Sequence, residues 1–453
     1  MKLSNKLVCT VSLLIFLGLG LSLYFLRFGR FFPLGESYYL LSVAGKLGGS
    51  DLVGRELGFS LIRFVYLLPT EIIPIIGIVV GSFSFVFLYL TMRKLNYKPL
   101  RTFSTLFLMV CSPSIFFLFY SATAHAFCVF FIILGIYLQI SERRMIYSII
   151  CFLIGILFSP VGIVSVPLSL FIYKEKGYGK KKYLLIVLLA FFVHLRYLIK
   201  YLILPIVRSN AVKIVLSDLG SRTGNGFFCM VFFLMGLYFL WRQKKRTLLF
   251  SGIVLAFFVG FYFNFLFYYI SFLICWIGGT GLYRFIKMRW TLKFFKSIVV
   301  GVVLFGIAFS MFTAFVGFVK SEPLQEQIDG LVWLRAHSGE DAVVLADREK
   351  GFMIEGIANR AVILDDLLLY TKDAKKRIDD LNAIFHSYSL RKTMAFLDEY
   401  NVSYIWVDRE MRERIWNNEE KGLLFVLRNK IFKKEFENPF VEIYSYNPGA
   451  VER

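Results

Sequence analysis

The sequence contains few cysteines and lacks the short motifs that most often reveal a catalytic centre. Its six cysteines all lie in apolar runs, and none falls within 320–453, which argues against disulfides and cysteine metal sites. It has no P-loop, no HExxH and no GxGxxG motif, so the usual signatures of nucleotide, zinc and dinucleotide binding are missing. Any chemistry must therefore use carboxylates, histidines and basic residues.

Apolar residues dominate what is present. Hydrophobic residues make up 57% and aromatic residues 18% of the 453 positions, and the mean hydropathy is +0.65. These values exceed those of ordinary globular domains and indicate a polytopic α-helical membrane protein. The first apolar run, 8–26, follows Lys2 and Lys6 and has no A-x-A-like cleavage site. We interpret it as a retained anchor rather than a secretory signal.

Further apolar runs are candidates for membrane spans. They cover 72–92, 103–120, 122–140, 146–173, 183–204, 227–241, 248–266, 268–283 and 297–319. The run 146–173 is too long for one plain helix, too short for two full ones, and contains the breaker SPVG at 159–162. This pattern predicts a pair of short helices or a re-entrant hairpin.

Basic residues gather in the connections between these runs. They are Arg93, Lys94, Lys98 and Arg101; Arg143 and Arg144; Lys174, Lys176, Lys180, Lys181 and Lys182; Arg242, Lys244, Lys245 and Arg246; and Arg284, Lys287, Arg289, Lys293 and Lys296. The positive-inside rule places them in the cytoplasm, which predicts about 11 transmembrane helices, or about 9 plus a re-entrant hairpin, with the N-terminus inside and the C-terminus outside. The net charge of +21 then reflects cell-membrane topology and contact with membrane lipids, not nucleic-acid binding.

Three segments share the predicted outer face: the first external loop 27–71, the loop 205–226, and a tail. The tail has a different pattern from the rest of the chain. Helical stretches at 322–338 and 389–401 alternate with short apolar runs that resemble strands, at 342–346, 361–364, 402–407 and 440–446. The sequence thus predicts a transmembrane domain, 1–319, and a small extracytoplasmic α/β domain, 320–453.

The start of the first external loop carries a family resemblance. It reads GESYY at 35–39 and continues as an amphipathic stretch to 64. Together with the N-terminal helix, the many spans and the external tail, this arrangement resembles the GT-C superfamily, whose members transfer sugars from lipid-phosphate donors. The resemblance covers nearly the whole chain and implies a polyprenyl (dolichyl) phosphate-linked sugar donor.

The tail adds to this resemblance. WLRAHSGEDAVVLADREKGFMIEGIANRAVILDD at 333–366 is similar to the segment after the last span of archaeal oligosaccharyltransferases. By that resemblance Asp347, Asn359 and Arg360 belong to the acceptor side. Leu345 and Ala346 stand where that family has tryptophans, and REK separates the acid from its glycine. These departures favour a relative that acts on another acceptor, which is a glycan, a lipid or a protein.

The resemblance assigns the catalytic role to Glu36, as the base or as a ligand of a divalent cation, Mg or Mn. Tyr38 and Tyr39, which lie beside it in the sequence, are candidate substrate-binding residues. Many family members supply a second acid in the next external turn, but this turn reads FYSATAHAF at 119–127 and has His125 instead. His125 is thus a candidate metal ligand or acid/base partner, with a hydrogen-bonding residue as the alternative, and metal dependence stays open. The alternative for Glu36 is a solvated loop carboxylate.

Basic residues near the outer face are candidates for binding the donor phosphate. Arg196 and Lys200 lie four positions apart in the run 183–204, so a helix would place both on one face. Charge at this depth suggests function, with snorkelling toward outer headgroups as the alternative, for Lys200 in particular. Three external arginines could clamp a phosphate or end a helix at the interface. They are Arg63, Arg208 and Arg222.

The sequence therefore predicts a membrane glycosyltransferase that uses a polyprenyl-phosphate-linked sugar and acts on the extracytoplasmic face. Two alternatives remain open. Interrupted helices and intramembrane charge also suit a secondary transporter or a flippase for a lipid-linked substrate. A missing second acid would suit a catalytically inactive GT-C-like scaffold.

Overall fold

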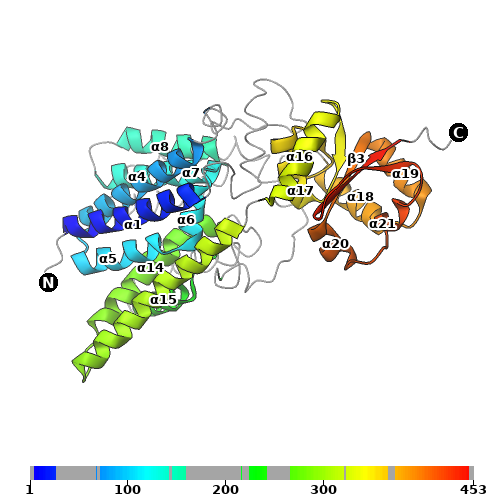
Figure 1. Ribbon diagram of the computed structural model, residues 1–453. Helices are drawn as coiled ribbons and strands as arrows, with labels where there is room; N and C mark the ends of the chain where they lie inside the picture. The colour runs from blue at the N-terminus through cyan, green and yellow to red at the C-terminus, as the bar shows by residue number, and fades with distance from the viewer. Residues whose placement is uncertain are drawn as a thin grey trace. The chain divides into compact units, whose positions relative to one another are not determined.

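The computed structural model describes residues 5–26, 68, 72–141, 145–159, 216, 224–241, 266–320, 323–365 and 373–447. The chain divides into two compact units, the first with the helices up to residue 320 and the second with residues 323–447. Figure 1 shows the helices of the first unit and the mixed helices and strands of the second.

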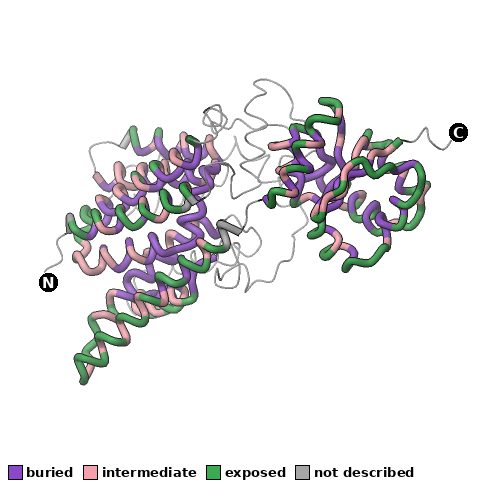
Figure 2. The backbone as a smooth tube through the Cα atoms, in the orientation of Figure 1, coloured by how far each residue is buried: buried purple, intermediate pink, exposed green. Residues whose placement is uncertain are grey.

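The described part of the first unit is helical. Its elements are α1 (Asn5–Leu26), α4 (Ile73–Lys94), α5 (Pro99–Val110), α6 (Pro113–Tyr120), α7 (Ala124–Ile140), α8 (Met145–Phe158), α12 (Phe227–Trp241), α14 (Leu266–Lys287) and α15 (Lys293–Lys320). Helix α12 packs against α14, and α7 packs against α8. All eight residues of α6 are buried, and this burial is visible in Figure 2.

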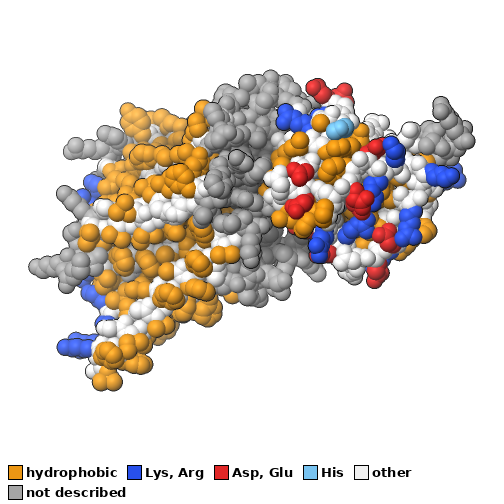
Figure 3. All heavy atoms as spheres, viewed as in Figure 1, with side chains coloured by type: hydrophobic (Ala, Val, Ile, Leu, Met, Phe, Trp, Pro, Cys, Tyr) orange, Lys and Arg blue, Asp and Glu red, His pale blue; other side chains and the backbone are white. Residues whose placement is uncertain are grey.

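Three helices in the described residues are long and apolar enough to cross a membrane: Ile73–Lys94, Leu266–Lys287 and Lys293–Val316. A fourth span results if α5 and α6, bent by 62° at their junction, are counted together. These helices indicate a membrane protein, and hydrophobic side chains dominate the described face of the first unit in Figure 3. The larger number of passes and the orientation stay predictions.

The apolar run 103–120, a candidate for one straight span, is a bent pair of helices. Pro113 is at the start of α6, and Ser112 before it is extended, with φ −83° and ψ 116°. Proline lacks a backbone N–H and disfavours helical geometry in the preceding residue, so the helix breaks there. Likewise, α8 ends at Phe158, next to the predicted breaker. The remainder of the run 146–173 lies outside the described residues.

The second unit is an α/β domain, as predicted. Its strands are β1 (Val343–Leu345), β2 (Ala361–Val362), β3 (Val402–Asp408), β4 (Phe432–Glu437) and β5 (Val441–Tyr446). Its helices are α16 (Gln325–His337), α17 (Arg348–Met353), the π-helix η3 (Ile354–Ala358), α18 (Ala374–His386), α19 (Leu390–Glu399), α20 (Arg409–Trp416) and α21 (Leu423–Val426). The sheet order is β2-β1-β3-β5-β4. Strands β2, β1 and β3 are parallel, and β5 is antiparallel to both β3 and β4.

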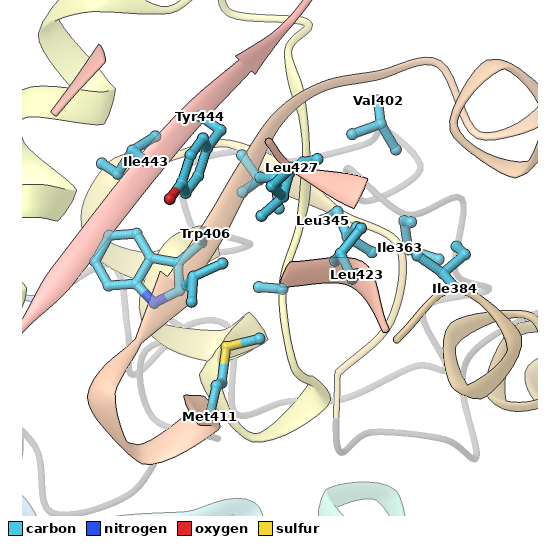
Figure 4. Packing of buried hydrophobic residues seen from close by; sticks show 14 of the residues in the cluster. Leu345, Ile363, Ile384, Val402, Trp406, Met411, Leu423, Leu427, Ile443 and Tyr444 are labelled. Atoms are coloured by element: carbon cyan, nitrogen blue, oxygen red, sulfur yellow. The ribbon is translucent and has the colours of Figure 1, made fainter. Parts of the chain in front are cut away.

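Strand β4 was not predicted from the sequence. It reads FKKEFE and lies at the edge of the sheet, so its lysines and glutamates face solvent. The hydrophobic core packs against the sheet, and in it Trp406 and Trp416 are almost fully buried. Figure 4 shows Trp406, Met411 and Tyr444 packed in this cluster.

Candidate functional site

Most of the predicted donor-side residues lie outside the described residues. These are Glu36, Tyr38, Tyr39, Arg63, Arg196, Lys200, Arg208 and Arg222. Their roles stay predictions. The structure describes the remaining candidates, which are His125 in the first unit and Asp347, Asn359 and Arg360 in the second.

His125 joins three elements of the first unit. It is the second residue of α7, and its Nδ1 atom lies 3.0 Å from the Tyr269 hydroxyl on α14 and 3.1 Å from the Ser159 hydroxyl that follows α8. The described residues contain no group of three or more His, Cys, Asp or Glu side chains that could hold a metal ion. The contacts of His125 are those of a hydrogen-bonding residue, and its role as a metal ligand stays a prediction.

A closed ring of hydrogen bonds, which we call the polar ring, lies inside the first unit. Ser112 donates to Asn225 Oδ1 at 2.8 Å, and Asn225 Nδ2 donates to the Ser271 hydroxyl at 2.9 Å. Ser114 donates to Ser271 at 2.7 Å and lies 3.1 Å from Ser112, which closes the ring. All four side chains are buried. The ring ties the α5–α6 break to the residues before α12 and to α14.

Sequence reasoning missed the polar ring. Its signal was a Ser-Pro-Ser step inside an apolar run, followed more than a hundred positions later by Asn225 at the edge of another run. Polar side chains within apolar spans are costly unless they are paired. Such residues therefore predict partners, although the sequence does not say which ones.

In the second unit, Asp347 and Asp408 mark the carboxyl ends of two neighbouring parallel strands. Asp347 follows β1 and precedes α17, and Asp408 ends β3 and caps α20 by accepting from Met411 N at 2.8 Å. After β1 the chain continues to β2, which lies beside β1 on one side of the pair. After β3 it continues to β4 and β5, which lie on the other side. Open α/β sheets bind ligands at such switch points. This edge is the candidate site of the second unit.

Charges at this edge are arranged in compensating pairs. Lys350 Nζ lies 3.4 Å from Asp408 Oδ2 and also contacts Glu410. Arg414 contacts Asp347 and donates to Glu349 at 2.8 Å. Burial lowers the pKa of Lys350, but its two carboxylate partners outweigh burial and raise that pKa above its usual value. The lysine therefore stays charged and holds the ends of β3 and α17 together.

Asp347 is mostly buried, and its carboxylate is already paired with Arg414. A ligand that used Asp347 would therefore have to share it with that guanidinium or displace it. The acceptor-side role of Asp347 stays a prediction, and it requires that a ligand compete with Arg414 for this carboxylate.

Arg360 forms a cap for the end of α16. Its Nε donates to the Ser338 hydroxyl at 2.6 Å, and its Nη2 donates to the carbonyls of Arg335 at 2.8 Å and Ser338 at 2.7 Å. A cation that bonds the last carbonyls of a helix also offsets the helix dipole. Asn359 precedes it with φ +54° and ends the π-helix. These contacts give both residues a structural role, and their acceptor-side roles stay predictions.

Comparison with known proteins finds likeness in structure. No family model and no curated protein matches the sequence. The chain is similar to the oligosaccharyltransferase of Archaeoglobus fulgidus in its apo form, with a TM-score of 0.62, 12% identity, and coverage of 98% of this chain and 74% of that one. The same archaeal enzyme, AglB, in complex with an inhibitory peptide and a dolichol-phosphate gives a TM-score of 0.60 at 11% identity, with coverage of 98% and 74%.

A further structure of the archaeal oligosaccharyltransferase, in complex with Zn and sulfate, gives a TM-score of 0.55 at 13% identity, covering 97% of this chain and 73% of that one. The mycobacterial arabinofuranosyltransferase AftD gives a TM-score of 0.54 at 13% identity, covering 99% of this chain and 42% of that one. Both proteins are GT-C glycosyltransferases. The resemblance to the GT-C superfamily is thus confirmed at the level of the fold, which this chain shares over nearly its whole length.

Proposed function

We propose that the protein is a GT-C-like membrane glycosyltransferase that transfers a sugar from a polyprenyl-phosphate-linked donor to an acceptor on the extracytoplasmic face. The observation that carries this proposal is the fold, which matches the archaeal oligosaccharyltransferase over 98% of this chain. One structure of that enzyme holds a dolichol-phosphate and another an acceptor peptide with the NVT sequon. These ligands support a lipid-linked donor and leave the class of acceptor to experiment.

In the proposed reaction, the acceptor nucleophile attacks the anomeric carbon of the sugar while the bond from that carbon to the lipid phosphate breaks. Glu36 takes the proton from the nucleophile, and the electron pair of the broken bond leaves with the polyprenyl phosphate. Arg196, with Arg208 or Arg222, offsets the negative charge that develops on this phosphate. Attack from the opposite side inverts the configuration at the anomeric carbon.

The scheme is written without a metal, because Glu36, one of the two candidate ligands, lies outside the described residues. The archaeal structure with Zn and sulfate motivates a direct test, since the sequence assigns Glu36 and His125 as candidate ligands of Mg or Mn. Activity that is lost on chelation and restored by Mn would establish the dependence.

The test uses the full-length protein purified in detergent with a set of radiolabelled polyprenyl-phosphate sugars and acceptor fractions. We expect transfer by the wild type and a loss of at least about a hundredfold in kcat for Glu36→Gln, as for a general base. Arg196→Ala should lower kcat/KM for the donor. Transfer that is unchanged in Glu36→Gln would remove the proposed base, and uptake of the lipid-linked sugar into vesicles without transfer would indicate the transporter or flippase alternative.

A further inference from the structure

One end of the first unit carries two basic turns, one between α4 and α5 and one between α14 and α15. Arg101 Nη2 donates to the Thr280 hydroxyl at 2.9 Å, and Trp276 Nε1 donates to the Tyr97 hydroxyl at 3.1 Å. These contacts tie the start of α5 to the last turns of α14, so both turns lie at the same end. We call this end the basic end, and its cations are Arg93, Lys94, Lys98, Arg284, Lys287, Arg289, Lys293 and Lys296.

No described residue of the first unit is Asp or Glu, and the sequence has neither from 219 to 321. The part of the first unit that the structure describes therefore has no carboxylate that could neutralise the basic end. Some of its cations contact aromatic rings or backbone instead. Arg284 lies 5.7 Å from the ring centre of Phe239, and Lys287 lies 5.2 Å from that of Tyr283. Such contacts orient a cation without cancelling its charge.

Large apolar side chains alternate with these cations in the second turn. Leu292 is 68% exposed and Phe294 is 79% exposed, on either side of Lys293. Met288 and Phe295 are also exposed. The turn joins two helices that are long and apolar enough to cross a membrane. Cations interleaved with exposed apolar groups at a span's end fit the boundary between lipid headgroups and acyl chains.

We propose that the basic end binds the headgroups of anionic phospholipids, with the phosphates on the cations and with Leu292 and Phe294 in the acyl region. The occupant is a lipid rather than a soluble anion because the site offers apolar anchors beside the charges. The proposal does not rest on the glycosyltransferase function, and it concerns other residues than those assigned to the donor phosphate. It gives a physical reason for a charge that the described protein groups leave unbalanced.

The test reconstitutes the full chain in phosphatidylcholine vesicles that contain trace spin-labelled phosphatidylglycerol or spin-labelled phosphatidylcholine. The ratio of the two association constants reports headgroup preference. Each surface cation contributes about 1 kcal/mol toward an anionic leaflet, which corresponds to roughly fivefold in affinity. We expect wild type to prefer phosphatidylglycerol by about fivefold or more, and this preference to fall in high salt.

The variant Lys98→Gln, Arg289→Gln, Lys293→Gln removes three of the eight cations, all three exposed and drawn from both turns, and should lower the ratio at least about fivefold. A matched control, Lys375→Gln, Arg391→Gln, Lys392→Gln, removes three exposed cations from the second unit and should keep the wild-type ratio. Unfolding curves check that both variants fold, and Arg289→Lys should keep the preference. Equal association of both lipids with wild type would overturn the proposal, as would competition by inorganic phosphate beyond that of chloride at equal ionic strength.

Discussion

Asn225 and Ser112 are joined by a buried hydrogen bond of 2.8 Å, although 113 positions separate them in the chain. This bond belongs to the polar ring, which holds the break between α5 and α6 against α14. Replacing Asn225 by leucine removes two of the ring's bonds and leaves the buried hydroxyls of Ser112 and Ser271 with one partner fewer each. We expect Asn225→Leu to lower the free energy of unfolding by about 1–3 kcal/mol.

Denaturation in detergent micelles, followed by circular dichroism, measures this loss. Ser297→Ala is the control, since Ser297 is exposed and bonds only the carbonyl of Lys293 in its own helix. A loss for Asn225→Leu no larger than that for Ser297→Ala would show that the ring does not stabilise the fold.

Gly236 allows α12 and α14 to approach closely. A methyl group at this position would lie 2.2 Å from the backbone oxygen of Ile277, whereas one at Gly301 on α15 would meet nothing within 4 Å. We expect Gly236→Ala to force the two helices apart and to cost roughly 1–3 kcal/mol, by overpacking. Gly301→Ala should be neutral or slightly stabilising, because alanine favours the helix. Relative to wild type, the melting temperature should therefore fall in Gly236→Ala and stay equal or rise slightly in Gly301→Ala. Equal changes in the two variants would contradict the close packing of α12 and α14.

Arg360 stabilises the second unit through the end of α16. Lysine keeps the charge but cannot make the four guanidinium hydrogen bonds that Arg360 makes to Ser338, Arg335 and Asn359. We expect Arg360→Lys to destabilise this unit by about 1–3 kcal/mol, since several partly buried hydrogen bonds of the guanidinium are lost. Limited proteolysis would show earlier cleavage near α16, and Arg391→Lys on the surface should behave as wild type. An effect on acceptor KM without any change in stability would favour the acceptor-side role instead.

Tyr444 makes the second unit sensitive to alkaline pH. Burial, together with Glu442, raises the pKa of Tyr444 from 10.0 to about 12, and its hydroxyl donates to Glu442 Oε2 at 3.0 Å. Because the folded state holds the proton more tightly than the unfolded state, this stabilisation is complete below pH 10 and is lost as the pH rises toward 12. Tyr444→Phe should therefore lose less stability than wild type between these values.

Guanidinium unfolding followed by tryptophan fluorescence measures this difference, because Trp406 and Trp416 lie in the core of the unit. Tyr388→Phe is the control, since Tyr388 is 60% exposed. If the free energy of unfolding fell with pH at the same rate in wild type and in Tyr444→Phe, Tyr444 would not be the source of the alkaline sensitivity.

Elements with a strong local signal could be predicted from the sequence. The run 227–241 coincides with α12, and the strands expected at 402–407 and 440–446 are β3 and β5. Hydropathy and its period are properties of neighbouring residues, which is why these elements were predictable. Strand β4 was missed because an edge strand exposes charged residues and leaves little apolar signal.

The candidate site could be predicted only in part. Asp347 was singled out by resemblance, but its ion pair with Arg414 depends on the two elements meeting across 67 positions. The same holds for His125, whose partner Tyr269 is 144 positions away. No local sequence pattern predicts which residues will pair across such separations, because the pairing follows from which helices and strands pack together.

Hydropathy and residue patterning alone indicate the membrane class, the helical spans with strong hydropathy and the α/β character of the tail, and short motifs carry the resemblance to GT-C glycosyltransferases. Three features become apparent only in the folded chain: α5 and α6 bend at the polar ring, Arg360 caps α16, and two basic turns lie at one end of the first unit. Each side chain has its own preference for burial, which can be predicted from the sequence. Hydrogen bonds and charge clusters need partners that only packing brings together.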